Sequence, residues 1–289
     1  MSTPTSLELP EGTRRATIET ARGEFAALDA VPAAGPCDLG TALLVPGYTG
    51  SKEDFTAILG QLAAAGRRVV AIDMRGQYQT QGPDDPAAYD IAELGADITA
   101  VADATQASHL LGHSFGGLVA RSAILGGYTP DSLTLLSSGP AALPGTRAEE
   151  LHFFLDHVDG TPEADLKDRV AELWAASLRP QAVKAGAGAP ILAFLEERML
   201  GNNPTGLVTM AAQLLNAEDR TADLAARSVP AFVLYGEDDN AWPAAQQQDM
   251  ATRLNAERTC IPGAAHNPNV EAPATTAHAL TTFWNATEH

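Results

Sequence analysis

Features that would place a protein in a specialised class are missing from this 289-residue sequence. It has only two cysteines, Cys37 and Cys260, far apart along the chain, which argues against a disulfide framework and favours free thiols in a reducing compartment. The first residues lack the basic and apolar segments of a secretory signal, and no apolar run approaches the ~20 residues of a membrane span. We therefore expect a cytoplasmic protein without a membrane span.

Basic residues are also scarce. Lys and Arg number 18 against 36 Asp and Glu, which gives a net charge of -18 at pH 7. Because nucleic acids and anionic membranes repel a polyanion, neither is expected as a partner. The sequence contains no Gly-rich dinucleotide or P-loop pattern, and its histidines show no metal-ligand spacing with acids or cysteines. No cofactor and no metal are expected, and nothing in the sequence indicates the oligomeric state.

What the sequence does contain is a regular alternation of apolar strands and amphipathic helices. Residues 14–29 form the pattern of a β-hairpin, two short alternating runs joined through Arg22-Gly23. From residue 41 to residue 137 short apolar runs alternate with helical patterns, and the alternation resumes at residue 229. Eight strands are predicted in all. Strands alternating with helices favour an α/β fold, with a mostly parallel sheet covered by helices on both faces.

Between residues 141 and 227 the pattern contains only helices. Thr161-Pro162-Glu163 has the form of a helix start, and residues 184–189 are a Gly/Ala-rich connection. A helical block without a strand of its own must pack on the sheet, where it can act as a lid. The predicted organisation is residues 1–140 as the first part of an α/β core, 141–227 as an inserted helical cap, and 228–289 as the second part of the core.

One Gly/Ser turn stands between a predicted strand and a predicted helix. It reads Gly112-His113-Ser114-Phe115-Gly116, the pattern G-x-S-x-G in the strand-turn-helix setting that gives the pattern its meaning. The glycines allow a sharp turn that lifts Ser114 Oγ above the sheet, with the N-terminus of the next helix facing any negative charge that develops there. A serine hydroxyl is a weak nucleophile at neutral pH and needs a base within hydrogen-bond reach.

Two further titratable groups follow strands of the second core segment. An acid, Asp238 or Asp239, comes directly after the strand at 229–235, and His266 follows the next short strand. Both positions are loops at the carboxyl ends of parallel strands, the edge where α/β sheets bind ligands. With Ser114 they stand in the order serine, acid, histidine. In such a triad His266 acts as the base, and the acid holds the histidine in the required tautomer.

These motifs carry a resemblance to a known family. Over essentially its whole length the chain resembles the α/β-hydrolase fold superfamily, in the variant with a helical cap. The matching segments are residues 112–117, 236–239, 262–266 and 73–76. The resemblance implies an eight-stranded, mostly parallel sheet flanked by helices, with the cap inserted, and it selects Asp239 over Asp238 as the acid. It also implies an oxyanion hole formed by the backbone N–H groups of Phe115 and Tyr48.

Two segments depart from the family pattern. The loop before Tyr48 usually reads His-Gly and here reads Pro46-Gly47, so Pro46 is expected to brace the loop through its fixed φ angle. The segment that begins at Asp73 has Tyr78 where the family usually carries a second glycine, which would reshape a pocket wall. Both departures lie in loops next to the expected site.

The expected function is that of a serine hydrolase. Ser114 would attack an ester-like carbonyl of a small-molecule acyl substrate and form an acyl-enzyme that water, activated by His266, releases, as in a carboxylesterase or lipase-like enzyme. Thioesterase, lactonase, C–C bond hydrolase, perhydrolase and acyltransferase activities use the same triad and stay open, as does a non-hydrolytic member of the fold that binds a ligand or acts as a lyase. Thr49, Trp242 and Trp174 are candidates to line the pocket, although core packing is the favoured interpretation for the two tryptophans.

Overall fold

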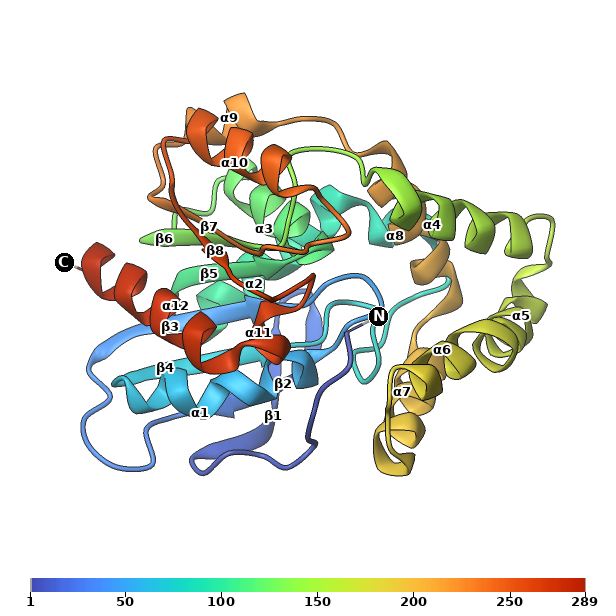
Figure 1. The fold of residues 1–289 in the computed structure, drawn as a ribbon, viewed down its shortest axis with the longest axis horizontal. Coiled ribbons are helices and arrows are strands. Elements are labelled where there is room, and N and C mark those ends of the chain that lie inside the picture. The colour runs from blue at the N-terminus through green and yellow to red at the C-terminus, as the bar shows by residue number, and fades with distance from the viewer. Residues whose placement is uncertain (1, 289) are drawn as a thin grey trace.

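The computed structural model describes residues 2–288 and contains an eight-stranded sheet in the order β1-β2-β4-β3-β5-β6-β7-β8 (Figure 1). The strands are β1 Thr13–Thr20, β2 Gly23–Ala30, β3 Leu39–Val45, β4 Arg67–Ile72, β5 Ala107–His113, β6 Ser132–Leu136, β7 Ala231–Gly236 and β8 Glu257–Ile261. β1 pairs antiparallel with β2, and β2 with β4, whereas the other neighbours are parallel. The predicted α/β fold with a mostly parallel, eight-stranded sheet is confirmed.

Helices cover both faces of this sheet. They are η1 Lys52–Phe55, α1 Thr56–Ala64, η2 Pro86–Tyr89, α2 Ile91–Thr105, α3 Phe115–Leu125, α10 Ala244–Arg253, α11 Pro268–Glu271 and α12 Pro273–Thr287. Along β3, Ala42 and Leu44 are buried in one cluster with residues of α1 and α12, whereas Leu43 and Val45 are buried in another with residues of α2 and α3. Because side chains alternate between the two faces of a strand, a strand covered on both faces must be apolar throughout. This explains the continuous apolar run of β3.

The regular structure between β6 and β7 is entirely helical. It comprises α4 Gly145–Val158, η3 Glu163–Asp165, α5 Leu166–Leu173, a π-helix at Trp174–Leu178, α6 Arg179–Lys184, α7 Ala189–Gly201, α8 Pro204–Asn216 and α9 Thr221–Ala225. We refer to residues 145–225 as the helical segment. Figure 1 shows α4, α5, α6 and α7 standing to one side of the sheet, with the N-terminus of the chain drawn between them and the strands.

Polar contacts join the helical segment to η1, to the N-terminal residues and to the segment after β4. Arg198 of α7 is fully buried and donates from Nη1 to Asp54 Oδ1 of η1 at 2.7 Å. Its Nη2 donates to the carbonyl oxygen of Ser2 at 2.6 Å. Asn203, just before α8, donates its backbone N–H to the carbonyl oxygen of Gly76 at 2.8 Å. Since a buried guanidinium must be paired and hydrogen-bonded, Arg198 holds α7, η1 and the N-terminal residues in one arrangement.

Candidate active site

Ser114 lies at the turn from β5 into α3. Its φ and ψ angles of 54° and -121° place a non-glycine residue in the positive-φ region, a strained conformation that recurs at functional sites. The turn fits because glycines flank it: a Cβ on Gly112 would meet the Gly116 carbonyl oxygen at 2.3 Å, and one on Gly116 would meet the Pro46 carbonyl oxygen at 2.4 Å. The Ser114 N–H donates to the Leu136 carbonyl oxygen of β6 at 2.9 Å. The strained turn is thereby held at the edge of the sheet.

The side chains of Ser114, His266 and Asp239 form a continuous chain of hydrogen bonds. His266 Nε2 lies 3.0 Å from Ser114 Oγ, and His266 Nδ1 lies 2.9 Å from Asp239 Oδ1. His266 comes from the loop after β8 and Asp239 from the loop after β7, so three loops that are far apart in the sequence meet at one edge of the sheet. Asp238, the alternative acid, is exposed to solvent, and the contact with His266 is made by Asp239.

Two further groups hold the Asp239 carboxylate in place. Its Oδ1 accepts from the backbone N–H of Ala241 at 2.9 Å, and its Oδ2 accepts from Gln247 Nε2 at 2.9 Å. Gln247, on α10, is fully buried, and its Nε2 also donates to the Trp242 carbonyl oxygen. A buried carboxylate is stable only when its oxygens are hydrogen-bonded. The sequence did not predict a role for Gln247, because the pattern of an amphipathic helix does not indicate which group a single polar side chain contacts.

The loop after β3 packs directly against the serine. A Cβ on Gly47 would lie 3.0 Å from Ser114 Cβ, so the lack of a side chain lets this loop approach closely. Tyr48 follows Gly47, and Phe115 begins α3, so the two residues expected to donate N–H groups to an oxyanion belong to the segments that meet at Ser114. Burial raises the pKa of the Tyr48 hydroxyl well above its usual range, so this phenol stays neutral.

Gln77 braces this loop from the segment after β4. Its Nε2 donates to the Gly47 carbonyl oxygen at 2.9 Å, and its Oε1 accepts from the Met74 N–H at 3.2 Å. The side chain is 1% exposed, so both hydrogen bonds are sheltered from water. Gln77 is therefore the hydrogen-bonding brace of the Tyr48 loop, and the expected bracing by the fixed φ angle of Pro46 stays a prediction.

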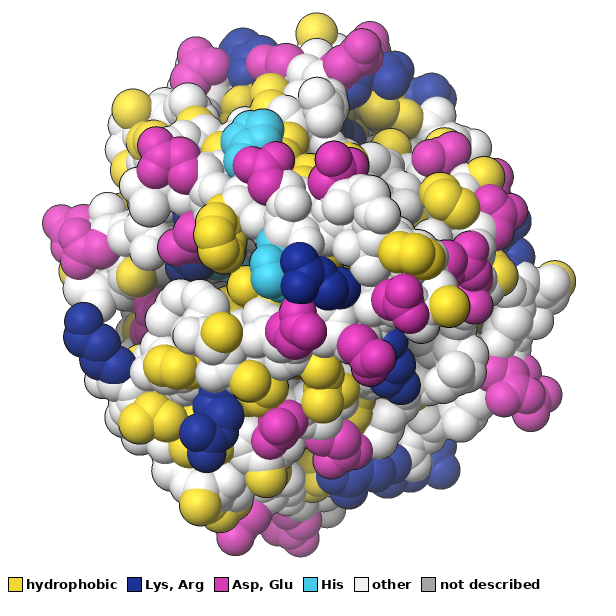
Figure 2. All heavy atoms as spheres, turned by 90° about the vertical axis from the view of Figure 1, so that its right-hand side faces the viewer, with side chains coloured by type: hydrophobic (Ala, Val, Ile, Leu, Met, Phe, Trp, Pro, Cys, Tyr) yellow, Lys and Arg dark blue, Asp and Glu magenta, His cyan; other side chains and the backbone are white. Residues whose placement is uncertain are grey.

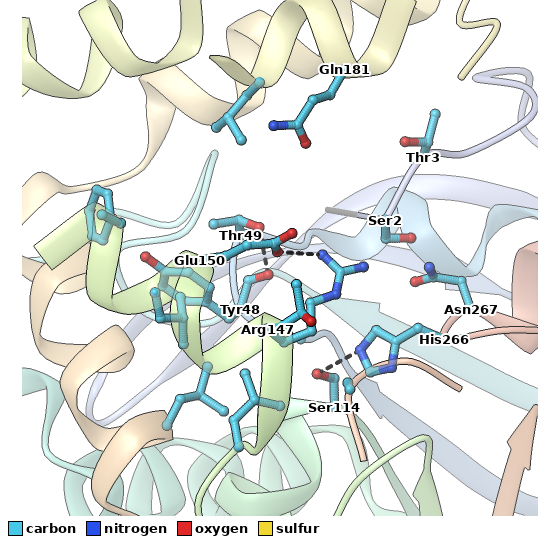
Figure 3. Close-up of a pocket in the computed structure, with 18 of the residues that line it drawn as sticks. Ser2, Thr3, Tyr48, Thr49, Ser114, Arg147, Glu150, Gln181, His266 and Asn267 are labelled. Atoms are coloured by element: carbon cyan, nitrogen blue, oxygen red, sulfur yellow. Dashed lines mark hydrogen bonds and ion pairs between the residues drawn. The ribbon is translucent and has the colours of Figure 1, made fainter. Parts of the chain in front are cut away.

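Ser114 and His266 lie at the floor of a pocket of about 680 Å³ (Figure 3). Tyr48 and Thr49 are part of its wall. Residues in and around the helical segment supply much of the remaining apolar lining: Leu143, Leu151, Phe154, Leu173, Leu178, Ala182, Met199 and Leu214. A pocket of this size and character can enclose a drug-sized organic molecule.

The two tryptophans considered as pocket residues are both buried. Trp242 is fully buried, donates from Nε1 to the Ala141 carbonyl oxygen at 3.1 Å, and packs with its ring centroid 6.5 Å from that of His266. Trp174 is 1% exposed and belongs to the hydrophobic core. Within residues 2–288 neither tryptophan is among the residues that line the pocket, and both belong to the hydrophobic core, which is the interpretation that the sequence favours. Bulky indoles fill the space between layers, and here Trp242 supports His266 from behind.

His113 is buried beside His266. Its Nε2 lies 2.9 Å from the His266 carbonyl oxygen, and its side chain is 2% exposed. Burial lowers the pKa of His113 to about 4, and the charge that His266 carries when protonated acts in the same direction. His113 is therefore neutral at pH 7 and donates from Nε2 to that carbonyl oxygen, which fixes the His266 loop.

Within residues 2–288, no group of three or more His, Cys, Asp or Glu side chains is arranged to hold a metal ion. No helix of the same region is both long enough and apolar enough to cross a membrane. Figure 2 shows the face that carries the outer helices of the helical segment, where acidic side chains are spread between basic and apolar ones. On this face the acidic side chains are scattered and form no single patch.

Comparisons with known proteins agree with this architecture. The alpha/beta hydrolase family profile matches residues 42–279. A non-heme haloperoxidase of Rhodococcus erythropolis is 27% identical over 256 residues, covering 76% of this chain and 83% of that protein. RutD, a candidate carbamate hydrolase of Variovorax paradoxus (strain S110), is 41% identical over 87 residues, covering 29% of this chain and 32% of that protein.

Solved structures show the same fold. A candidate lipase, Lip1, from Acinetobacter baumannii AYE matches with a TM-score of 0.76 at 18% identity, covering 96% of this chain and 92% of that one. At this identity the likeness is one of fold alone. The family profile, in contrast, runs from β3 across the helical segment into α12 and so takes in most of the chain. The protein is an enzyme of the alpha/beta hydrolase family.

Proposed function

We propose that the protein is a serine hydrolase that cleaves an ester-like bond of a small-molecule acyl substrate. The observation that carries the proposal is the pair of hydrogen bonds, at 3.0 and 2.9 Å, that link Ser114, His266 and Asp239 at the floor of the pocket. A serine beside a base that is itself oriented by a carboxylate is the arrangement that activates a hydroxyl as a nucleophile.

In the proposed reaction Ser114 Oγ attacks the carbonyl carbon while His266 Nε2 takes its proton, and Asp239 stabilises the imidazolium. The oxyanion accepts hydrogen bonds from the backbone N–H groups of Tyr48 and Phe115. When the tetrahedral intermediate collapses, the bond to the leaving group breaks, and that group takes the proton from His266 Nε2. Water, deprotonated by His266 Nε2, then attacks the acyl carbon. The bond from that carbon to Ser114 Oγ breaks, Oγ takes the proton from His266 Nε2, and the acid is released.

In this proposal residues 1–140 and 228–289 form the core, and residues 141–227, which contain the helical segment, form an inserted cap over the triad. Its contribution is the apolar lining above Ser114, which comes from residues such as Leu151, Phe154 and Leu214. Apolar walls lower the local dielectric, so hydrogen bonds to a developing oxyanion are stronger there than in water. They also leave space for a hydrocarbon acyl chain.

Turnover of a panel of esters, thioesters and lactones of graded acyl length tests the proposal. Ser114→Ala and His266→Ala are each expected to lower kcat/KM by about 10⁴ or more, because the triad acts as a unit. The urea midpoint of each variant should stay close to that of the wild-type protein. His278→Ala, at an exposed histidine of α12, is the control and should keep full turnover. Near wild-type turnover in either triad variant would remove the role assigned to that residue.

A further inference from the structure

The first residues of the chain form part of the wall of the active-site pocket. Ser2 and Thr3 both line the pocket that contains Ser114 and His266, and we refer to these two residues as the N-terminal wall. Figure 3 shows both on the side of the pocket where His266 lies. In Figure 1 the N-terminus is drawn between the strands and the outer helices of the helical segment. The pocket is thus bounded by the core, by the helical segment and by the start of the chain.

Buried contacts hold the N-terminal wall in this place. The Ser2 carbonyl oxygen accepts from Arg198 Nη2 at 2.6 Å, and Arg198 Nη1 donates to Asp54 Oδ1 at 2.7 Å. Ser2 is 7% exposed, and the side chains of Arg198 and Asp54 are both 0% exposed. Because a buried guanidinium must keep its hydrogen-bond partners, the ion pair that joins α7 to η1 also fixes the backbone of Ser2.

Asp54 connects this ion pair to two loops of the active site. Its Oδ2 accepts from the Ser51 N–H at 3.2 Å, at the end of the loop that carries Tyr48. Its carbonyl oxygen accepts from Asn269 Nδ2 at 2.7 Å, and Asn269 lies three residues after His266. The N-terminal wall, the Tyr48 loop and the His266 loop are therefore tied to one buried residue.

The chain that follows the N-terminal wall is anchored as well. Leu7 packs against one hydrophobic cluster of the core and Leu9 against the other. Pro10 packs closely on α1, since a Cβ on Gly60 would lie 2.8 Å from Pro10 Cβ. The Pro10 carbonyl oxygen accepts from the Thr13 N–H at 3.0 Å, where β1 begins. Terminal residues that are tied down in this way form a fixed boundary of the pocket.

The location of the N-terminal wall assigns it to one half of the substrate. Because His266 Nε2 must deliver a proton to the leaving group, that group has to lie on the His266 side of Ser114. The apolar lining from the helical segment, such as Phe154 and Leu214, is then left for the acyl chain. The N-terminal wall therefore borders the space that the leaving group occupies.

We propose that Ser2 and Thr3 limit the size of the leaving group that the active site accepts. A wall that is held through its backbone cannot move aside for a bulky alcohol without losing the bond from Arg198, so large alcohols are penalised and small ones are accepted. The limit is one of shape and needs no hydrogen bond from the substrate to either side chain. The inference rests on the proposed function of the triad and adds the size of the alcohol that this triad releases.

Three neutral esters test this size limit. Methyl butanoate and benzyl butanoate differ only in the alcohol, whereas methyl butanoate and methyl octanoate differ only in the acyl chain. Deletion of residues 2–5 removes the N-terminal wall and leaves Leu7 and Leu9 as anchors. The ratio of kcat/KM for the benzyl ester to that for methyl butanoate should then rise about tenfold over wild type, the low end of what one extra methylene costs in a close-fitting pocket. The ratio for the two acyl chains should not change.

Thr3→Trp tests the same limit in the opposite direction and keeps the backbone of Ser2. A larger side chain in the N-terminal wall takes space from the alcohol, so the benzyl-to-methyl ratio should fall about tenfold. Thr5→Trp is the matched control, since Thr5 is exposed and is not among the described residues that line the pocket. The control should keep the wild-type ratio. If the deletion variant does not fold, Thr3→Trp decides.

The outcomes separate the size limit from the triad. If wild-type protein hydrolyses the esters in a Ser114-dependent manner and Thr3→Trp has the same benzyl-to-methyl ratio as Thr5→Trp, the size limit is wrong and the proposed function stands. A folded deletion variant with an unchanged ratio overturns the limit in the same way. So does an acyl-chain ratio that changes as much as the alcohol ratio. If wild-type protein hydrolyses none of the three esters, the proposed function fails and the size limit fails with it.

Discussion

Replacing Gln77 by leucine is expected to lower turnover more than substrate binding. The Gln77 amide joins two loops, donating to the Gly47 carbonyl oxygen at 2.9 Å and accepting from the Met74 N–H at 3.2 Å. Leucine has a similar volume and no polar atoms, so the variant removes both hydrogen bonds without opening a large cavity. The Gly47 oxygen keeps its bond from the Gly50 N–H, but the loop that carries Tyr48 loses its tie to the segment after β4.

The structure sets the size of two separate effects. Leaving the Met74 N–H without its partner in a buried setting costs about 1–3 kcal/mol of unfolding free energy. Complete loss of one oxyanion donor costs about 10²–10³ in kcat, and Gln77 acts on the Tyr48 N–H only through Gly47, so we expect a loss of about 10- to 30-fold. KM should change little, because Gln77 is not among the described residues that line the pocket.

Steady-state kinetics on one chromogenic ester, together with urea unfolding, would measure both effects. The inhibition constant of a boronic acid, which forms a tetrahedral adduct with a reactive serine, should rise by about the factor lost in kcat. Gln213→Leu is the matched control, since Gln213 Nε2 likewise donates to a backbone carbonyl oxygen, that of Tyr89, at 2.5 Å. It should lower stability without lowering kcat. An unchanged kcat in Gln77→Leu, with its stability reduced, would refute the reasoning.

Three further outcomes are expected. Asp239→Asn should lower kcat/KM by about 10⁴, whereas Asp238→Asn should stay within a few fold of wild type, and the opposite result would make Asp238 the acid. The free energy of unfolding should fall by up to about 3 kcal/mol as the pH falls from about 6.5 to about 4. The unfolded chain protonates His113 near its usual pKa, whereas burial lowers the pKa of His113 to about 4 in the folded protein. An equally steep fall in the His113→Gln variant would contradict this origin. Arg198→Met should lower the free energy of unfolding by about 3–5 kcal/mol, because it leaves the buried Asp54 unpaired. In a double-mutant cycle with Asp54→Asn, additive losses of stability would show that the two side chains are not coupled.

Local patterns predict most of the sheet and its helices. The apolar run expected as a strand at 41–45 is the C-terminal part of β3, and the helix expected at about 91–104 is α2, Ile91–Thr105. A period of two or of 3.6 residues is a property of contiguous residues, so it can be recognised without knowing what the element packs against. Ser114 and His266 can be predicted for the same reason: Ser114 directly follows β5, His266 lies five residues after the end of β8, and the sequence pattern predicts both strands.

The contacts that complete the site have no such local signal. Gln77 reaches a carbonyl oxygen 30 residues away, and Ser2 is held by an arginine 196 residues away. Neither residue belongs to a periodic element, so only the folded chain shows what their polar atoms contact. Trp242 illustrates the same limit for apolar residues, since an indole beside a catalytic loop has the same pattern whether it faces a ligand or the core.

Labelling with a fluorophosphonate probe tests most directly whether Ser114 is the nucleophile. The intact mass of the wild-type protein is expected to rise by one phosphonyl group, and the peptide that contains Ser114 is expected to carry it. Ser114→Ala should show no adduct, and His266→Ala should be labelled far more slowly, because the hydroxyl has lost the base 3.0 Å away. A folded wild-type protein that gains no mass, or that carries the adduct on another residue, would contradict the proposed serine hydrolase.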